Sequence, residues 1–205
     1  MNFLAHLALS GNSPQVMTGN FIADHVKGKS YLNYPQDISK GIIMHRFIDD
    51  FTDHHPLVLQ GKKRLSENYG KYSGVVVDIF YDHFLSVNWN QYYAMPLNNF
   101  ISHSYISILS NIRYLPPGIL SFLPHLILFN RLNTYSKING IEYVLKKMAI
   151  HFNMPGKSEM AANTLIQYYS EYNTEFIEFY NDIINELKKN KKEAEIQGFT
   201  GLSSF

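Results

Sequence analysis

The sequence predicts an all-α fold, and two kinds of observation support this prediction. In two long stretches, apolar residues recur every three or four positions, which is the spacing of one helix face. Signals that start or stop helices also punctuate the chain, such as Ser13-Pro14 and His55-Pro56. No internal repeat or long linker divides it. We therefore expect a single-domain helical bundle over residues 1–192, followed by a disordered tail over residues 193–205.

The composition restricts the class of protein. The chain has 205 residues, a formal net charge of +1 and no cysteine. A near-neutral charge gives no overall field to attract nucleic acid or an anionic membrane, and the lack of cysteine excludes disulfides and thiolate metal sites. No apolar run reaches the length of a membrane span, and the N-terminus does not read as a signal peptide. We expect a cytoplasmic protein that is not inserted in a membrane and binds no nucleic acid.

The N-terminal part is expected to form two buried or half-buried segments. Residues 2–9 are almost all apolar, with His6 in their midst. Ser13 and Pro14 then suit the cap and first position of a helix that carries Asp24 and ends near Gly28. A loop over residues 29–35 is expected to lead into the central helix.

The central helix carries the first pair of residues suited to chemistry. Its apolar stripe consists of Met44, Phe47, Ile48 and Phe51. His45 and Asp49 are four residues apart, so both side chains point along one flank of this stripe. Such a pair can hold a metal ion, or it can form a plain histidine–carboxylate hydrogen bond. Helical backbone is disfavoured at His55 because Pro56 comes next, and a new helix is expected to start at Pro56.

Residues 73–89 form a second informative stretch, in which apolar residues surround Asp78, Asp82 and His83. A helix buried all round fits this pattern, although the three valines would also suit a strand. Buried carboxylates are costly unless cations or donors meet them. Either an Arg or Lys partner in the core or a metal ion would satisfy this need.

The C-terminal half is expected to form helices that pack on the rest of the protein. We expect a helix through Ile101 and Ile112, a break at residues 116–118, an apolar helical segment over residues 119–129 and a helix near residues 136–150. Ser158 can cap one long last helix. Its expected stripe contains Leu165, Tyr169, Tyr172, Phe176, Phe179, Ile183 and Leu187.

The polar residues in apolar surroundings are all histidine or aspartate. Oxygen and imidazole ligands together suit Mn, Fe, Mg or Zn, and helical folds build metal sites from one inward ligand per helix. These residues are His6, Asp24, His45, Asp49, Asp78, Asp82 and His83.

Several sequence blocks resemble the acyl carrier protein phosphodiesterases. They are residues 1–7 (MNFLAHL), 19–24 (GNFIAD), 41–49 with Thr52-Asp53 and Pro56, and 82–86 (DHFLS). The resemblance covers most of the chain and is densest in residues 1–90. It implies an HD-domain-like, all-α phosphohydrolase that splits holo acyl carrier protein into the apo form and 4′-phosphopantetheine, usually with manganese. Mg²⁺ or Fe²⁺ would also fit. The adjacent His-Asp pair of the HD group is missing, since Arg46 follows His45 and the nearest doublet, Asp82-His83, has the reverse order.

The resemblance also implies roles for individual residues. Metal ligands are expected among Asp24, His45, Asp49 and Asp78, with His6 as a further candidate. Asp49, Asp82 or His83 would align the attacking water and take its proton.

Basic residues near these blocks are candidates for substrate binding. Arg46 would either clamp phosphate oxygens or pair with Asp50 or Asp53. Because acyl carrier proteins are acidic, a basic rim should dock the protein substrate, although each of these side chains also suits a solvated surface. The candidates are Lys27, Lys29, Lys62, Lys63 and Arg64.

Two other functions fit the same residues. One is an HD-type phosphohydrolase acting on a nucleotide or alarmone, which would use a small-molecule pocket rather than a basic rim. The other is a non-catalytic helical binding protein, which would hold no metal.

Overall fold

A computed structural model describes residues 2–152, 154–155 and 158–196. Within these ranges all regular elements are helices, so the all-α prediction is confirmed. The helices are α1 (Phe3–Leu9), α2 (Pro14–Ile22), α3 (Gln36–His54), α4 (Pro56–Tyr69), α5 (Ser73–Val87), α6 (Trp89–Tyr92), α7 (Leu97–Ser110), α8 (Pro117–Leu128), α9 (Arg131–Thr134), α10 (Ile138–Phe152), α11 (Ser158–Gln167) and α12 (Tyr169–Ile196). Short 3₁₀ turns are η1 (Ala23–His25), η2 (Ser30–Asn33), η3 (Gly70–Tyr72) and η4 (Ile112–Tyr114).

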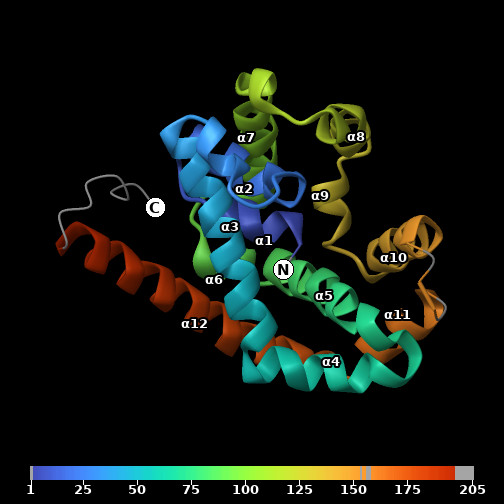
Figure 1. The fold of residues 1–205 in the computed structure, drawn as a ribbon. Coiled ribbons are helices and arrows are strands. Elements are labelled where there is room, and N and C mark those ends of the chain that lie inside the picture. The colour runs from blue at the N-terminus through green and yellow to red at the C-terminus, as the bar shows by residue number, and fades with distance from the viewer. Residues whose placement is uncertain (1, 153, 156–157, 197–205) are drawn as a thin grey trace.

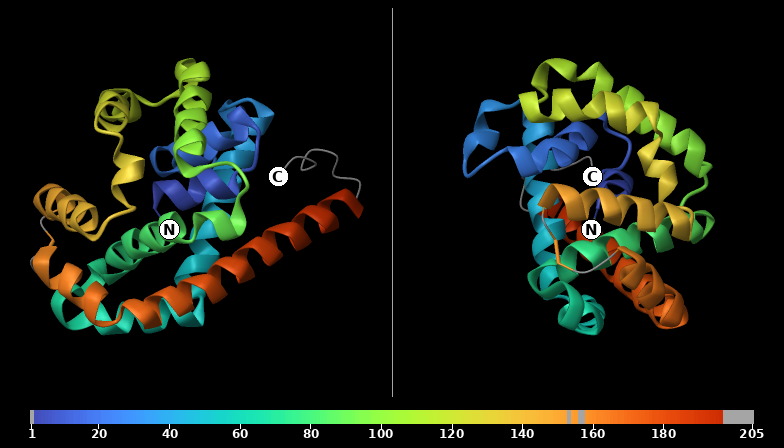
Figure 2. Two further views of the ribbon diagram at one scale, coloured as in Figure 1. Left: turned by 180° about the vertical axis from the view of Figure 1, so that it is seen from behind. Right: turned by 90° about the vertical axis from the view of Figure 1, so that its right-hand side faces the viewer.

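Helix α1 lies in the middle of the molecule, between α2 and α5 (Figure 1). The long helix α12 crosses α4 and α5 and buries its aromatic stripe against them. Helices α7 to α10 follow one another around one side of the molecule (Figure 2). The central position of α1 places residues near the N-terminus, including His6, beside side chains from α2, α3 and α5.

Local signals explain the helix ends that frame the site. Ser13 caps α2, since its Oγ accepts a hydrogen bond from the Val16 N–H, and Pro14 follows at the first helical position. Helix α3 ends at His54 and α4 begins at Pro56, as expected. The stretch after residue 73 is the helix α5 and not a strand.

Three expectations for the C-terminal half need correction. The last helix is two helices that meet at Tyr168, so Leu165 belongs to α11 and not to the stripe of α12. Helix α7 ends at Ser110, before Ile112. Helix α12 continues to Ile196, past the expected start of the tail at residue 193, and residues 197–205 of that tail lie outside the described residues.

Among the described residues, none of the helices combines the length and the apolar character that crossing a membrane would need.

Candidate functional site

Helices α2 and α3 pack so closely that their backbones touch. A Cβ atom added to Gly19 would lie 2.0 Å from the Ile38 carbonyl oxygen, and one added to Gly41 would lie 2.1 Å from that of Val16. Only glycine allows this approach. The contact brings the end of α2, with Asn20 and the following η1 turn, against the flank of α3 that carries His45.

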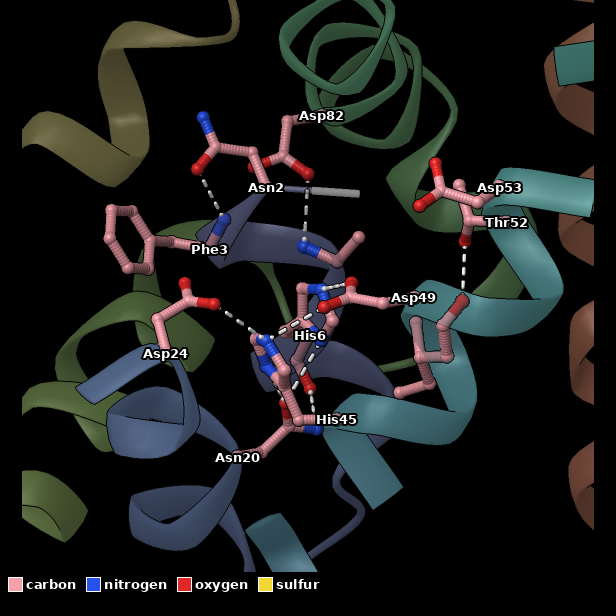
Figure 3. Close-up of polar contacts among 12 residues, drawn as sticks. Asn2, Phe3, His6, Asn20, Asp24, His45, Asp49, Thr52, Asp53 and Asp82 are labelled. Atoms are coloured by element: carbon pink, nitrogen blue, oxygen red, sulfur yellow. Dashed lines mark hydrogen bonds and ion pairs between the residues drawn. The ribbon is translucent and has the colours of Figure 1, made fainter. Parts of the chain in front are cut away.

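Two histidines and one aspartate converge where α1 meets this helix pair. The rings of His6 and His45 stack with centroids 4.1 Å apart. His6 Nε2 lies 3.1 Å from Asp49 Oδ1, and His45 Nε2 lies 3.0 Å from Asp49 Oδ2 (Figure 3). Asp24 approaches from η1, with Oδ1 3.3 Å from His45 Nε2. The structure thus brings together His6, Asp24, His45 and Asp49.

Asn20 orients both imidazole rings. Its Oδ1 lies 2.9 Å from His6 Nδ1 and 3.0 Å from His45 Nδ1. Its Nδ2 donates to the His6 carbonyl oxygen and to Ser10 Oγ, which fixes Oδ1 as the acceptor for the two rings. Both Nδ1 atoms therefore carry the proton, and when the rings are neutral both Nε2 lone pairs face Asp49.

Burial and ion pairing pull the pKa values of these groups apart. Burial lowers the pKa of His6 below its usual value, against the effect of Asp49. Burial would also lower the pKa of His45, but hydrogen bonds to Asp24 and Asp49 outweigh it and raise the pKa to about 9. The two imidazoles hold the pKa of Asp49 well below its ordinary value despite burial, and His45 lowers that of Asp24. Both carboxylates are therefore ionised at neutral pH.

The cluster lines a cavity of about 240 Å³. Asp24, with 71% of its side chain exposed, lies at the mouth, and Asp49 is 41% exposed. Asp78 of α5 is half-buried and lines the same cavity. The remaining lining residues are Asn2, Phe3, Asn20, Phe21, Thr52 and Asp53.

The donor atoms fit a divalent metal ion. One ligand atom each from His6, His45 and Asp49 lie within 4.8 Å of one another. His6 Nε2 is buried and makes no hydrogen bond in the described part of the chain, despite its distance to Asp49. A buried nitrogen with a free lone pair beside a carboxylate is what an imidazole–carboxylate metal site requires.

Two predicted residues of α5 lie elsewhere. The buried carboxylate of Asp82 accepts hydrogen bonds from the backbone N–H groups of Leu4 and Ala5, at 2.9 and 3.1 Å, and so holds the first turn of α1. Burial raises its pKa to about 7, although these two donors oppose the shift. The imidazole of His83 lies 2.7 Å from the Tyr135 carbonyl oxygen and 3.0 Å from the Tyr169 hydroxyl. Neither Asp82 nor His83 lines the cavity.

Arg46 also lies outside the cavity lining. Its Nη2 donates to the Val26 carbonyl oxygen at 2.7 Å, and its guanidinium lies over the Tyr31 ring. It therefore ties the segment after η1 to α3. Two roles were expected for Arg46. Among the described contacts it neither lines the cavity nor forms an ion pair with Asp50 or Asp53.

The candidate docking residues divide into three groups. Lys27 and Lys29 are exposed between η1 and η2. Lys62 and Lys63 line a second cavity beside the first one. Arg64 makes a two-pronged ion pair with buried Glu175, at 2.8 and 2.6 Å, so its charge is already matched inside the protein.

Asn20 was not among the residues that the sequence pointed to. An asparagine within an apolar helix that carries no acidic residue is the signal that could have identified it, since a fully buried amide needs several hydrogen-bond partners.

Comparison with known proteins gives a consistent result. The family model described as acyl carrier protein phosphodiesterase matches residues 1–183. The chain is 34% identical over 183 residues to a protein of that name from Photorhabdus laumondii, covering 88% of this chain and 91% of the relative. A relative with the same name from Yersinia pestis is 33% identical, with 88% and 94% covered, and one from Salmonella agona is 33% identical over 150 residues, with 73% and 78% covered.

No solved structure matches the chain, so its expected relation to the HD-domain fold stays a prediction. The range matched by the family model contains all the residues that line the cavity, and the similarity to these relatives extends over most of the sequence. The chain belongs to the acyl carrier protein phosphodiesterase family.

Proposed function

We propose that this protein is a metal-dependent phosphodiesterase that removes 4′-phosphopantetheine from holo acyl carrier protein and leaves the apo protein. Membership of the family and the names of its relatives support the reaction. The observation that carries the metal dependence is the convergence of His6 Nε2, His45 Nε2 and Asp49 in an open cavity, with Asn20 fixing both rings.

The residues that would hold the ion are His6, His45, Asp49 and Asp24. The mixture of imidazole and carboxylate ligands suits Mn²⁺, with Mg²⁺ or Fe²⁺ as alternatives. When bound, such an ion polarises phosphoryl oxygens and lowers the pKa of a coordinated water. Asp78 lines the cavity on the side of α5, and Asp53 of α3 adds a further carboxylate to the lining.

The side chains of the cavity can assist the hydrolysis directly. Asp24 would approach the ion through Oδ1, the oxygen that lies 3.3 Å from His45 Nε2, and this leaves Oδ2 at the mouth of the cavity to orient the attacking water. The new P–O bond forms opposite the serine oxygen. The bond from phosphorus to that oxygen breaks, serine leaves as the alcohol after gaining a proton, and 4′-phosphopantetheine keeps the phosphate.

Lys62 and Lys63 are the best placed of the expected docking residues, because they lie in a cavity that adjoins the site. Lys27 and Lys29 are exposed but line neither cavity. Arg64 is least suited, since Glu175 already engages it. Asp82 and His83 support the scaffold through backbone hydrogen bonds and not the reaction.

The experiment is incubation of the purified protein with holo acyl carrier protein and Mn²⁺, followed by intact-mass spectrometry. We expect loss of the phosphopantetheine arm, no loss after treatment with a chelator, and recovery when Mn²⁺ is restored. A parallel assay with free nucleotides tests the alternative phosphohydrolase function. An unchanged carrier protein together with nucleotide hydrolysis would contradict the proposal.

A further inference from the structure

The candidate site is bordered by two chemically different surfaces. On the side of Asp24, Phe3 and Phe21 line the cavity, with ring centroids 5.4 Å apart. The ring of Phe122, from α8, lies 5.9 Å from that of Phe3. We call Phe3, Phe21 and Phe122 the aromatic flank. Figure 3 shows Phe3 beside Asp24, while Thr52 and Asp53 lie on the opposite side of the His6–His45 pair.

Helix α8 is fitted against the turn that carries Asp24. A Cβ atom added to Gly118 would lie 2.9 Å from His25 Cε1, so the first turn of α8 packs directly on η1. Phe122, one turn further along, is half-buried against Phe3, whereas Leu128 and Phe129 at the far end of the helix are 78% and 58% exposed. The position of α8 therefore extends the apolar wall outward from the cavity.

The opposite side opens into a basic groove. A second cavity of about 550 Å³ shares Asp53 and Asp78 with the first, so the two cavities adjoin at these residues. We call it the lysine groove, because Lys62, Lys63 and Lys71 are among the residues that line it, with Ser66, Gly70, Ser73, Gly74 and Val75 beside the two shared aspartates. Lys62 is paired with Asp53 at 2.7 Å, whereas Lys63 is exposed and forms no ion pair within the part of the chain described.

The substrate has a matching asymmetry. Its phosphate joins a serine of an acidic protein to the pantoyl group of pantetheine, in which the second carbon from the phosphate oxygen carries two methyl groups. Apolar methyl groups gain from contact with an aromatic surface, and an acidic protein surface gains from facing unpaired lysines. We propose that the substrate binds in one direction: the pantetheine arm runs over the aromatic flank, and the carrier protein covers the lysine groove. This direction rests on the proposed function and adds Phe122 and Lys63 as residues that determine specificity.

The first test measures binding of the arm alone. Isothermal titration in the presence of Mn²⁺ gives the Kd of 4′-phosphopantetheine and of inorganic phosphate for the wild type, Phe122→Ala and Phe129→Ala. We expect Phe122→Ala to weaken 4′-phosphopantetheine by about tenfold, the effect of losing an apolar contact of this size, and to leave phosphate unchanged. Phe129→Ala removes the same side chain from the exposed end of α8 and should change neither Kd. An equal loss for phosphate would mean that the variant has disturbed the fold of the site, which would overturn a direct role of Phe122.

The second test examines the protein side of the substrate. Lys63→Glu should raise the KM for holo acyl carrier protein by about three- to tenfold at low salt, less at high salt, and should leave the Kd of 4′-phosphopantetheine unchanged. Lys189→Glu, with the same change of charge on an exposed residue of α12, is the matched control and should have no effect.

A reversed pattern would overturn the proposed direction: Phe122→Ala acting only on the KM for the carrier protein, or Lys63→Glu acting on 4′-phosphopantetheine. Unchanged affinity of Phe122→Ala for 4′-phosphopantetheine, measured with an active wild type, would overturn the direction alone. A wild type that releases no 4′-phosphopantetheine from the carrier protein would instead overturn the proposed function.

Discussion

The molecule contains two groups of buried or half-buried histidine and aspartate residues, and they differ in what satisfies them. In the cluster of His6, His45 and Asp49, the polar atoms face one another across an open cavity, and one ring nitrogen makes no hydrogen bond in the described chain. Asp82 and His83 are buried in surroundings that are equally apolar. Their polar atoms, however, are taken up by backbone groups and by one tyrosine.

This difference shows that burial of an ionisable side chain does not by itself indicate chemistry. Asp82 joins α5 to the first turn of α1, where backbone N–H groups lack helical partners. Asp49 instead bridges two imidazoles whose other nitrogens are held by Asn20. The partners of a buried carboxylate, and not its burial, separate the candidate site from the scaffold. Matched substitutions in the two groups test this distinction.

Asp49→Asn is expected to have the largest effect. The amide would place an N–H donor against an imidazole nitrogen and remove the negative charge, so Mn²⁺ binding should be lost and turnover should fall on the order of 10³-fold. The melting temperature should fall to some extent as well, because the pairing with two imidazoles that lowers the pKa of Asp49 also stabilises the folded state at neutral pH, so turnover is compared per folded molecule. Steady-state kinetics and circular dichroism measure both quantities. Activity near the wild-type level would remove Asp49 from the reaction.

Asn20→Ala is expected to act on the metal through the two rings. Without the shared acceptor, neither imidazole keeps its tautomer, and Mn²⁺ affinity should fall about 10- to 100-fold. Asn88→Ala is the control. Asn88 is also a buried asparagine, but its side chain donates hydrogen bonds to the Phe84 carbonyl oxygen and to Asn173 Oδ1 and contacts neither histidine of the site. Both variants should lose stability, and only Asn20→Ala should lose affinity per folded molecule. Equal affinities, measured by titration calorimetry, would deny Asn20 this role.

The pH dependence of Mn²⁺ binding should follow His45. In the metal-free protein its pKa is raised to about 9, so below that pH a proton must leave before Nε2 can bind the ion. Affinity should therefore rise by about tenfold per pH unit up to about pH 9 and then level off. Calorimetry in buffers with different ionisation enthalpies measures the released proton. A flat profile below pH 9 would mean that His45 is not a ligand.

Asp82→Asn should have the smallest effect on activity. An amide can accept only one of the two N–H bonds from Leu4 and Ala5, so we expect the free energy of unfolding to fall by about 1–3 kcal/mol. Turnover per folded molecule should remain at the wild-type level. Urea denaturation and active-site titration separate the two quantities. A variant with the stability of the wild type but without turnover would mean that Asp82 takes part in the reaction, and the proposed difference between Asp82 and Asp49 would then be wrong.

Local patterns in the sequence predicted a large part of the fold and of the site. The apolar stripe of α3 and the flank shared by His45 and Asp49 follow from helical spacing alone, and Pro56 predicted the end of that helix correctly. The break at Tyr168 was missed because the aromatic stripe continues across it at helical spacing. Helical periodicity cannot register a change in the direction of the helix axis.

Contacts between distant segments explain the remaining errors. The partners of Asp82 are backbone N–H groups 77 and 78 residues away, and no pattern near residue 82 indicates them. The role of Asn20 likewise depends on rings from α1 and α3 meeting at one oxygen atom. Side-chain identity predicted which groups could bind a metal, whereas tertiary packing decides which of them meet.

The two glycines at the contact of α2 and α3, Gly19 and Gly41, fix the distance between these two helices at the site. With a methyl group at Gly19 or Gly41, a contact of about 2 Å would have to open to at least 3.0 Å, and the helices would have to separate. The Asn20 side chain on α2 would then move away from His45 and Asp49 on α3. Substitution of Gly19 or Gly41, which would contact neither the ion nor the substrate, should therefore lower the affinity for the metal ion as much as the loss of a ligand does.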